Sequence, residues 1–154
     1  MNPSPRKRVA LFTDGACLGN PGPGGWAALL RFNAHEKLLS GGEACTTNNR
    51  MELKAAIEGL KALKEPCEVD LYTDSHYLKK AFTEGWLEGW RKRGWRTAEG
   101  KPVKHRDRWE ALLLAMAPHR VRFPSVRALR KAGNSSPSKW PIRERKALGS
   151  TRVP

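Results

Sequence analysis

The sequence predicts a single α/β domain built on a mixed β-sheet, and three observations support this prediction. A length of 154 residues suits one domain with a real hydrophobic core. Short apolar runs alternate along the chain with segments that have helical spacing. Two of the runs, RVALFTD and EVDLYTD, end on the same Thr-Asp pair, as strands do when they deliver polar residues to one edge of a sheet.

The first half of the chain is predicted to form three strands. Residues 8–14 form the first strand, and the segment GACLGNPGPGG after it is predicted to be a loop because it is rich in Gly and Pro. WAALLRF (26–32) and KLLSGGEA (37–44) form two further strands joined by a hairpin connection. The two glycines in the third strand indicate a bulge or a sheet edge.

The clearest helix is predicted over residues 47–63. Its leucines and Ile57 recur at helical spacing, and polar residues suited to a helix cap precede it. A strand over 68–74, a short helix over 75–84, a helix over 109–117 and a strand over 120–123 follow. This order makes the first and fourth strands parallel neighbours, with their last residues side by side.

The chain divides into three parts by composition. Residues 8–123 are expected to form the folded domain, within which 85–105 interleaves tryptophans with Lys and Arg. Residues 1–7 are expected to be a flexible basic N-terminus. Residues 124–154 form a basic tail rich in Ser and Pro and poor in apolar residues, which we expect to be disordered.

The charge of the chain favours a polyanionic partner. There are 29 Lys and Arg against 15 Asp and Glu, which gives a net charge of +14. Such a field attracts nucleic acid through phosphate neutralisation and counterion release. A solvated surface without any partner is the alternative that charge alone leaves open.

The cysteines and the length of the apolar runs indicate the cell compartment in which the protein works. Cys17, Cys45 and Cys67 match neither a zinc spacing nor an even-numbered disulfide framework, which favours reduced thiols in a cytoplasmic protein. No run approaches twenty apolar residues, and MNPSPRKR lacks the apolar stretch of a signal peptide. We therefore expect no membrane association and, by default, a monomer.

Three acids are candidates for chemistry: Asp14, Glu52 and Asp74. Each has a structural alternative, since Asp14-Gly15 is a common turn pair, Glu52 could complete a capping box, and Asp74 could cap the next helix. Two like charges about 4 Å apart repel by about 4 kcal/mol at an effective dielectric near 20, so a cluster of all three needs a cation. Mg²⁺ or Mn²⁺ suits such oxygen ligands, and two such ions can promote phosphodiester cleavage.

Three blocks of sequence resemble the signature blocks of bacterial type 1 ribonuclease H: FTDGACLGNPGPGGWAALL, TTNNRMELKAAIEGLKAL and LYTDSHYL. The likeness runs from about Val9 to Phe123, includes GWRTAEGKPVK, and is greatest to enzymes of Thermus-type bacteria. It implies a ribonuclease H-like fold, with a five-stranded mixed sheet flanked by helices and a basic helical protrusion over about 85–105. It also implies endonucleolytic cleavage of the RNA strand of RNA–DNA hybrids with two Mg²⁺ ions, leaving 5′-phosphate and 3′-hydroxyl ends.

The resemblance also implies roles for individual residues. The metal-binding, catalytic carboxylates are Asp14, Glu52 and Asp74. Asn20, Asn48 and Asn49 are expected to contact the minor groove of the hybrid, with Cys17 beside them. Thr47, Arg50 and His105 are expected to bind a phosphate of the DNA strand, and Trp86 is expected to pack on a sugar. For Trp86, Trp90 and Trp109, packing within the protrusion is the alternative.

The family pattern is expected to fail after Phe123. The family has a histidine loop and a helix with a fourth carboxylate there, but the chain has no histidine after His119 and no aspartate after Asp107. A replaced or frameshifted C-terminus without the family helix is therefore expected, with Glu144 a poor substitute ligand and catalysis weak or dependent on Mn²⁺. Two alternatives remain: a nucleic-acid-binding domain that does not cut, and an integrase- or resolvase-like relative with another substrate.

Overall fold

The computed structural model describes residues 6–19 and 21–124 of the chain. Expectations for the first five residues, Asn20, Glu144 and the tail from residue 125 onward lie outside the described residues. The described part contains five strands and four helices: β1 (Lys7–Cys17), β2 (Gly22–Phe32), β3 (His35–Thr46), α1 (Asn48–Lys61), β4 (Cys67–Thr73), α2 (His76–Thr83), α3 (Trp86–Lys92), α4 (Arg106–Met116) and β5 (Arg120–Arg122).

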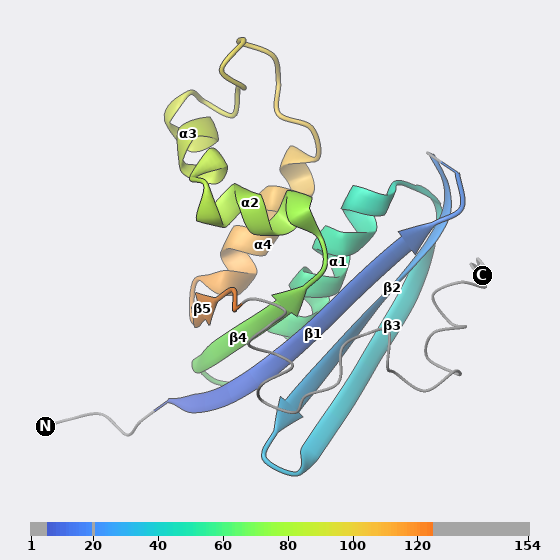
Figure 1. Ribbon diagram of the computed structural model, residues 1–154, viewed down its shortest axis with the longest axis vertical. Coiled ribbons are helices and arrows are strands. Elements are labelled where there is room, and N and C mark those ends of the chain that lie inside the picture. The colour runs from blue at the N-terminus through green and yellow to red at the C-terminus, as the bar shows by residue number, and fades with distance from the viewer. Residues whose placement is uncertain (1–5, 20, 125–154) are drawn as a thin grey trace, which may run out of the picture.

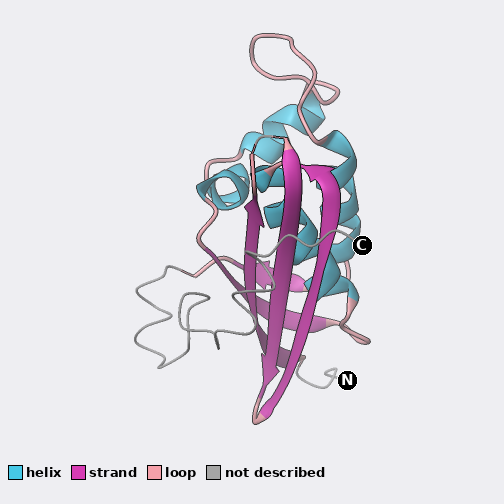
Figure 2. Ribbon diagram, turned by 90° about the vertical axis from the view of Figure 1, so that its right-hand side faces the viewer, coloured by secondary structure: helices cyan, strands magenta, loops and turns pink. Residues whose placement is uncertain are grey.

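The strands form one five-stranded mixed sheet in the order β3-β2-β1-β4-β5. β1 pairs antiparallel with β2 and parallel with β4, which confirms the predicted neighbours. The parallel register sets Thr13 opposite Thr73. The β2–β3 turn lies at the end of the sheet opposite to α3 and the loop that follows it (Figures 1 and 2).

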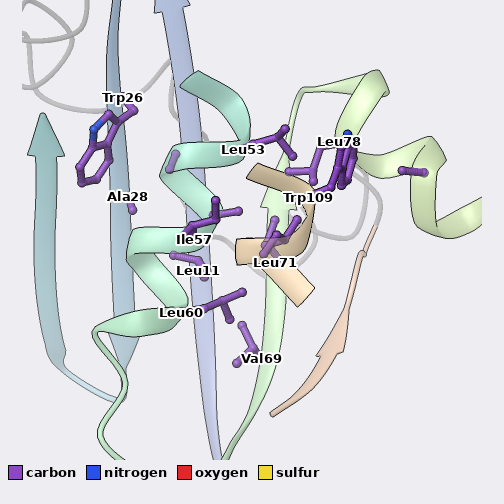
Figure 3. Packing of buried hydrophobic residues seen from close by; sticks show 14 of the residues in the cluster. Leu11, Trp26, Ala28, Leu53, Ile57, Leu60, Val69, Leu71, Leu78 and Trp109 are labelled. Atoms are coloured by element: carbon purple, nitrogen blue, oxygen red, sulfur yellow. The ribbon is translucent and has the colours of Figure 1, made fainter. Parts of the chain in front are cut away.

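The main core lies between α1 and the sheet. Thr47 caps α1 by accepting a hydrogen bond from the Arg50 N–H, and the helix then buries apolar residues against β1 and β2. Figure 3 shows Ile57 and Leu60 of α1 beside Leu11 and Leu71 of the two central strands. Burial of such side chains contributes about 1.5–3 kcal/mol each, so this face holds the domain together.

A cluster of aromatic rings joins the remaining helices. Trp109 of α4 is fully buried, and its Nε1 donates to Tyr77 Oη of α2 at 3.0 Å. The rings of Trp90 and Phe82 also contact Trp109. The predicted alternative of core packing therefore holds for Trp109 and in part for Trp90, whereas Trp86 is 36% exposed at the start of α3.

The predicted loop over residues 15–25 is wrong for most of its length. β1 continues to Cys17 and β2 begins at Gly22, and the two strands stay paired to the Cys17–Gly24 position. The glycines allow close packing rather than a turn, because a Cβ on Gly24 would lie 2.5 Å from Thr46 Cγ2. The predicted strands and helices are otherwise confirmed, with end shifts of up to four residues.

Candidate active site

The register of β1 and β4 brings two of the candidate acids to one edge of the sheet. Asp14 follows Thr13 within β1, and Asp74 follows Thr73 at the end of β4. The negative charge of Asp74 raises the pKa of Asp14, after the larger effect of burial, which shows that the two side chains interact. The Gly15 N–H donates to Asp14 Oδ1 at 3.0 Å and partly offsets these effects.

Glu52 reaches the same place from helix α1. The helix approaches β1 closely because Gly15 has no side chain there: a Cβ on Gly15 would lie 2.6 Å from the Glu52 nitrogen. Glu52 is only 6% exposed. Burial and the charge of Asp14 raise its pKa from 4.5 to about 8, with a smaller contribution from Asp74. The three predicted carboxylates therefore share one electrostatic site.

The structural alternatives for the three acids do not hold. The capping residue of α1 is Thr47, so Glu52 lies two positions beyond the capping-box position. The capping residue of α2 is Ser75, whose side chain accepts from the Leu78 N–H, so Asp74 has no capping role. Asp14 lies inside β1 rather than in a turn.

One carboxylate of the acidic site, Glu52, has the chemistry of a cation ligand. Glu52 Oε2 is buried and has no hydrogen-bond partner among the described residues, and an ionised carboxylate in such a position needs a cation or a proton. The acids are not arranged as a finished ligand set, since no group of three or more His, Cys, Asp or Glu in the described part of the chain could hold a metal ion. Mutual repulsion between carboxylates opposes tighter clustering until a cation neutralises them.

The predicted minor-groove residues lie beside this acidic site. Asn48 is exposed and Asn49 is half-buried, and they form the first turn of α1. The Cys17 thiol lies 3.4 Å from the Gly22 carbonyl oxygen and 3.3 Å from that of Thr46, so it links the ends of three strands. The structure thus places Cys17 at the edge of the site as a packed thiol.

The residues predicted to bind a phosphate of the DNA strand lie together, but one of them also pairs with an acid that was not predicted. Thr47, Arg50 and His105 do come together, with Arg50 Nη1 3.3 Å from His105 Nδ1. However, Arg50 also forms a bidentate pair with Asp107, at 3.1 and 2.8 Å. No sequence pattern indicates a role for Asp107, because the contact joins positions far apart in the chain and only the packing of α4 on α1 creates it.

Two cavities are lined in part by residues of α2, and the first of them includes one of the acids. One of about 430 Å³ lies beside Asp74 and is lined by His76, Lys79 and Lys80 among others. The other, of about 260 Å³, lies where α1, α2 and the loop after α3 meet, and Asn49, Tyr77, Trp90 and His105 are among its lining residues. No sequence pattern indicates a role for His76 or Tyr77, which follow the Thr73-Asp74 pair after Ser75.

Arg108 forms part of the same charged region. Its Nη2 lies 2.5 Å from Glu43 Oε2 of β3. The pair fastens the start of α4 to the edge strand.

Cys17, Cys45 and Cys67 are all free thiols, and none of the described helices has the length and apolar character needed to cross a membrane.

Comparison with known proteins gives a consistent result. The family model described as RNase H matches residues 6–136. Proteins named ribonuclease H from two strains of Thermus thermophilus are 96% and 95% identical over 127 residues, which is 82% of this chain and 76% of theirs. A ribonuclease H of a Chelativorans species is 64% identical over 79% of this chain and 74% of its own length.

Solved structures agree on the fold. The crystal structure of LC9-RNase H1, described as a type 1 RNase H with the type 2 active-site motif, superposes with a TM-score of 0.72 at 24% identity, covering 99% of this chain and 88% of that one. LC11-RNase H1, solved in complex with an RNA/DNA hybrid, superposes with a TM-score of 0.60 at 19% identity, covering 92% and 94%.

Proposed function

Since this chain belongs to the ribonuclease H family of enzymes, we propose that it hydrolyses the RNA strand of RNA–DNA hybrids at internal positions, leaving 5′-phosphate ends. The observation that carries the proposal is the set of coupled acids at the joined ends of β1 and β4. A site that concentrates negative charge within a chain of net charge +14 suits a substrate made of phosphodiesters and a cationic cofactor.

Asp14, Glu52 and Asp74 are the residues proposed to hold Mg²⁺, as two ions, with Mn²⁺ as a substitute. Bound there, divalent ions would supply an activated water and stabilise the leaving oxygen of the cleaved phosphodiester. Glu52 contributes a buried carboxylate oxygen that has no other partner in the described part of the chain. Asp14 interacts electrostatically with both of the other acids, since Asp74 raises the pKa of Asp14 and the charge of Asp14 raises the pKa of Glu52.

The residues around the acids are proposed to select the hybrid. Amide groups of Asn48 and Asn49 can donate to and accept from base edges and the 2′-hydroxyl, the group that distinguishes RNA from DNA. Asn20 and Cys17 are proposed to contribute at the same groove. Trp86 is exposed enough to pack on a sugar.

The phosphate grip is proposed to act on the DNA strand. Thr47, Arg50 and His105 would hold one of its phosphates, while Lys and Arg of residues 85–105 neutralise its backbone.

We also propose that cleavage is weak or requires Mn²⁺. The family resemblance includes a histidine loop and a fourth carboxylate, and this sequence has no histidine after His119 and no aspartate after Asp107. Loss of one metal ligand reduces the hold on one ion, whereas hybrid binding depends on residues that remain. The second candidate function is therefore a hybrid-binding domain that does not cut, favoured by the same two departures.

The deciding experiment compares labelled RNA–DNA hybrid, double-stranded DNA and double-stranded RNA, each with Mg²⁺ or Mn²⁺. Cleavage of the hybrid alone, abolished by Asp14→Asn, supports the enzyme. Asp70→Asn is the matched control, because Asp70 lies on β4 but pairs with Arg8 and Arg122 outside the site. Hybrid binding without cutting under either metal supports the second candidate, and turnover as fast as that of a complete family member contradicts the proposed impairment.

We propose that the protein works as a monomer in the cytoplasm. Its free cysteines suit a reducing compartment. Size-exclusion chromatography with light scattering, with and without hybrid, tests the oligomeric state, and a mass near twice 17.3 kDa would contradict it.

A further inference from the structure

The guanidinium group of Arg50, which is proposed to bind a phosphate, is paired in the free protein with the carboxylate of Asp107. Its Nη1 and Nη2 donate to Asp107 Oδ1 and Oδ2 at 3.1 and 2.8 Å, which is the geometry in which a guanidinium also binds a phosphate. We propose that the Asp107 carboxylate occupies the phosphate-binding face of Arg50 in the free protein and is displaced by a backbone phosphate of the DNA strand when the hybrid binds. This inference rests on the proposed function, since it requires a hybrid as the ligand.

The surroundings of the pair are those of an anion site. Thr47 Oγ1 lies 3.3 Å from the Arg50 nitrogen, and His105 Nδ1 lies 3.3 Å from Arg50 Nη1. Lys104 precedes His105 and, with it, lines the cavity between α1 and the loop after α3. The two guanidinium nitrogens of Arg50 are the donors at this point, and Asp107 is the carboxylate that now accepts from both of them.

Exchange of the two anions is energetically accessible. The Asp107 side chain is 65% exposed and that of Arg50 is 25% exposed, and ion pairs so open to solvent contribute little to stability. The pairing with Arg50 lowers the pKa of Asp107 to about 2, so the carboxylate is charged and competes with phosphate at every pH at which the protein works.

A second cationic side chain, that of Arg108, lies close enough to attract the Asp107 carboxylate once phosphate has displaced it from Arg50. Arg108 Nε lies 4.0 Å from Asp107 Oδ2, while Arg108 Nη2 remains bound to Glu43. Asp107 can therefore move from Arg50 toward Arg108 without losing all of its electrostatic stabilisation. Because Asp107 can pair with Arg108 instead, a phosphate of the substrate can displace it from Arg50.

A structural role for Asp107 predicts the opposite result. Asp107 lies in the first turn of α4, where an acid favours the helix, and it could serve only to orient Arg50. If it orients Arg50, its removal weakens hybrid binding. If it competes with phosphate, its removal strengthens binding, so the sign of the change separates the two roles.

The test measures the binding of the full chain to a fluorescent RNA–DNA hybrid by anisotropy, in EDTA so that no strand is cut. Asp107→Asn is expected to lower the Kd two- to fivefold, where fivefold equals about 1 kcal/mol, the upper end for an exposed ion pair. Asp107→Glu, which keeps the carboxylate, is expected to bind as the wild type does.

Glu110→Gln is the matched charge control. It removes one negative charge from the same helix, but Glu110 pairs only with Arg106 in the described structure. An equal gain in Glu110→Gln would mean a general charge effect and would overturn the inference. Chemical denaturation of each variant shows whether folding has changed.

Two further measurements tie the effect to Arg50 and to the DNA strand. In an Arg50→Ala background, Asp107→Asn is expected to give no gain. A methylphosphonate at the contacted position of the DNA strand, found by scanning, is expected to abolish the gain as well. A gain that survives both, or weaker binding by Asp107→Asn, overturns the inference.

The outcomes for the inference and for the proposed function are distinct. A wild type that binds hybrid without cutting it contradicts the proposed cleavage, yet the Kd ratio still decides the role of Asp107. A wild type that cuts hybrid while Asp107→Asn binds no tighter contradicts the inference alone. A wild type that does not bind hybrid contradicts both.

Discussion

Gly15 lies so close to Glu52 that no side chain fits between them. A Cβ on Gly15 would lie 2.6 Å from the Glu52 nitrogen and 2.7 Å from the Met51 carbonyl carbon. Backbone atoms of a helix cannot give way as a flexible side chain can. The contact therefore fixes the distance between the end of β1, which carries Asp14, and the helix that carries Glu52.

Gly15→Ala is expected to lower both stability and cleavage. The added methyl group pushes α1 away from β1, at a cost of about 1–3 kcal/mol in the free energy of unfolding, as is usual for overpacking. Gly89→Ala is the control, because the nearest atoms to a Cβ there belong to the flexible Arg93 side chain. That change in α3 is expected to be neutral or slightly stabilising. Urea denaturation and hybrid cleavage measure both, and an unaffected Gly15→Ala would contradict the argument.

Glu52 is expected to make the metal-free protein less stable as the pH rises. Its pKa is about 8 in the folded state against 4.5 when exposed, so between these values the folded state holds a proton that the unfolded state has lost. The contribution of Glu52 to stability is therefore full below pH 4.5, falls progressively between pH 4.5 and 8, and is lost once the pH has risen above the folded-state pKa. One pKa unit corresponds to about 1.4 kcal/mol, and we expect a loss of about 2–4 kcal/mol by pH 9.

Glu52→Gln isolates this effect. Urea denaturation in EDTA at pH 5, 7 and 9 should show a shallower decline for the variant than for the wild type, since glutamine does not titrate. Parallel curves for the two proteins would show that Glu52 is ionised without penalty in the folded state.

Divalent cations are expected to offset the loss of stability that follows when the buried Glu52 carboxylate ionises. At pH 8, millimolar Mg²⁺ or Mn²⁺ should raise the melting temperature of the wild type, because a ligand that binds only the folded state stabilises it. Glu52→Gln and Asp14→Asn should lose most of this response, while Asp70→Asn keeps it. Differential scanning fluorimetry with EDTA and metal titrations measures the shift, and equal responses from all four proteins would place the metal elsewhere.

Tyr77→Phe is expected to cost about 1–2 kcal/mol of stability. Trp109 is fully buried and its Nε1 donates to Tyr77 Oη at 3.0 Å, so the variant leaves a buried donor without a partner. Tyr72→Phe is the control, since the Tyr72 ring stacks on Phe12 but its hydroxyl has no hydrogen-bond partner in the described part of the chain. We expect that control to change stability by less than about 0.5 kcal/mol, as judged by urea denaturation.

The sequence predicts the sheet and the acidic site for a definable reason. The Thr-Asp endings of two apolar runs mark the point where the pairing of β1 with β4 stops, and parallel pairing brings such positions together whatever the rest of the fold does. Glu52 is also predictable, because it follows the helix cap Thr47 at a fixed distance along a regular helix.

Other parts of the site depend on packing that no local pattern records. Gly15 and Gly24 were predicted to lie in a loop because glycine favours turns, whereas they serve close contacts between β1, β2 and α1. The pair between Arg50 and Asp107 forms only once α4 lies against α1. His105, at φ 61°, adopts a left-handed conformation that its sequence neighbours do not indicate.

The pairing of β1 with β4 has a consequence for the timing of activity during synthesis. Asp14 and Asp74 lie about sixty positions apart in the chain, and the register that unites them does not exist until the later strand has left the ribosome. A nascent chain that stops before β4 has only one of these two acids, so the proposed metal site cannot form until β4 has been synthesised and has paired with β1.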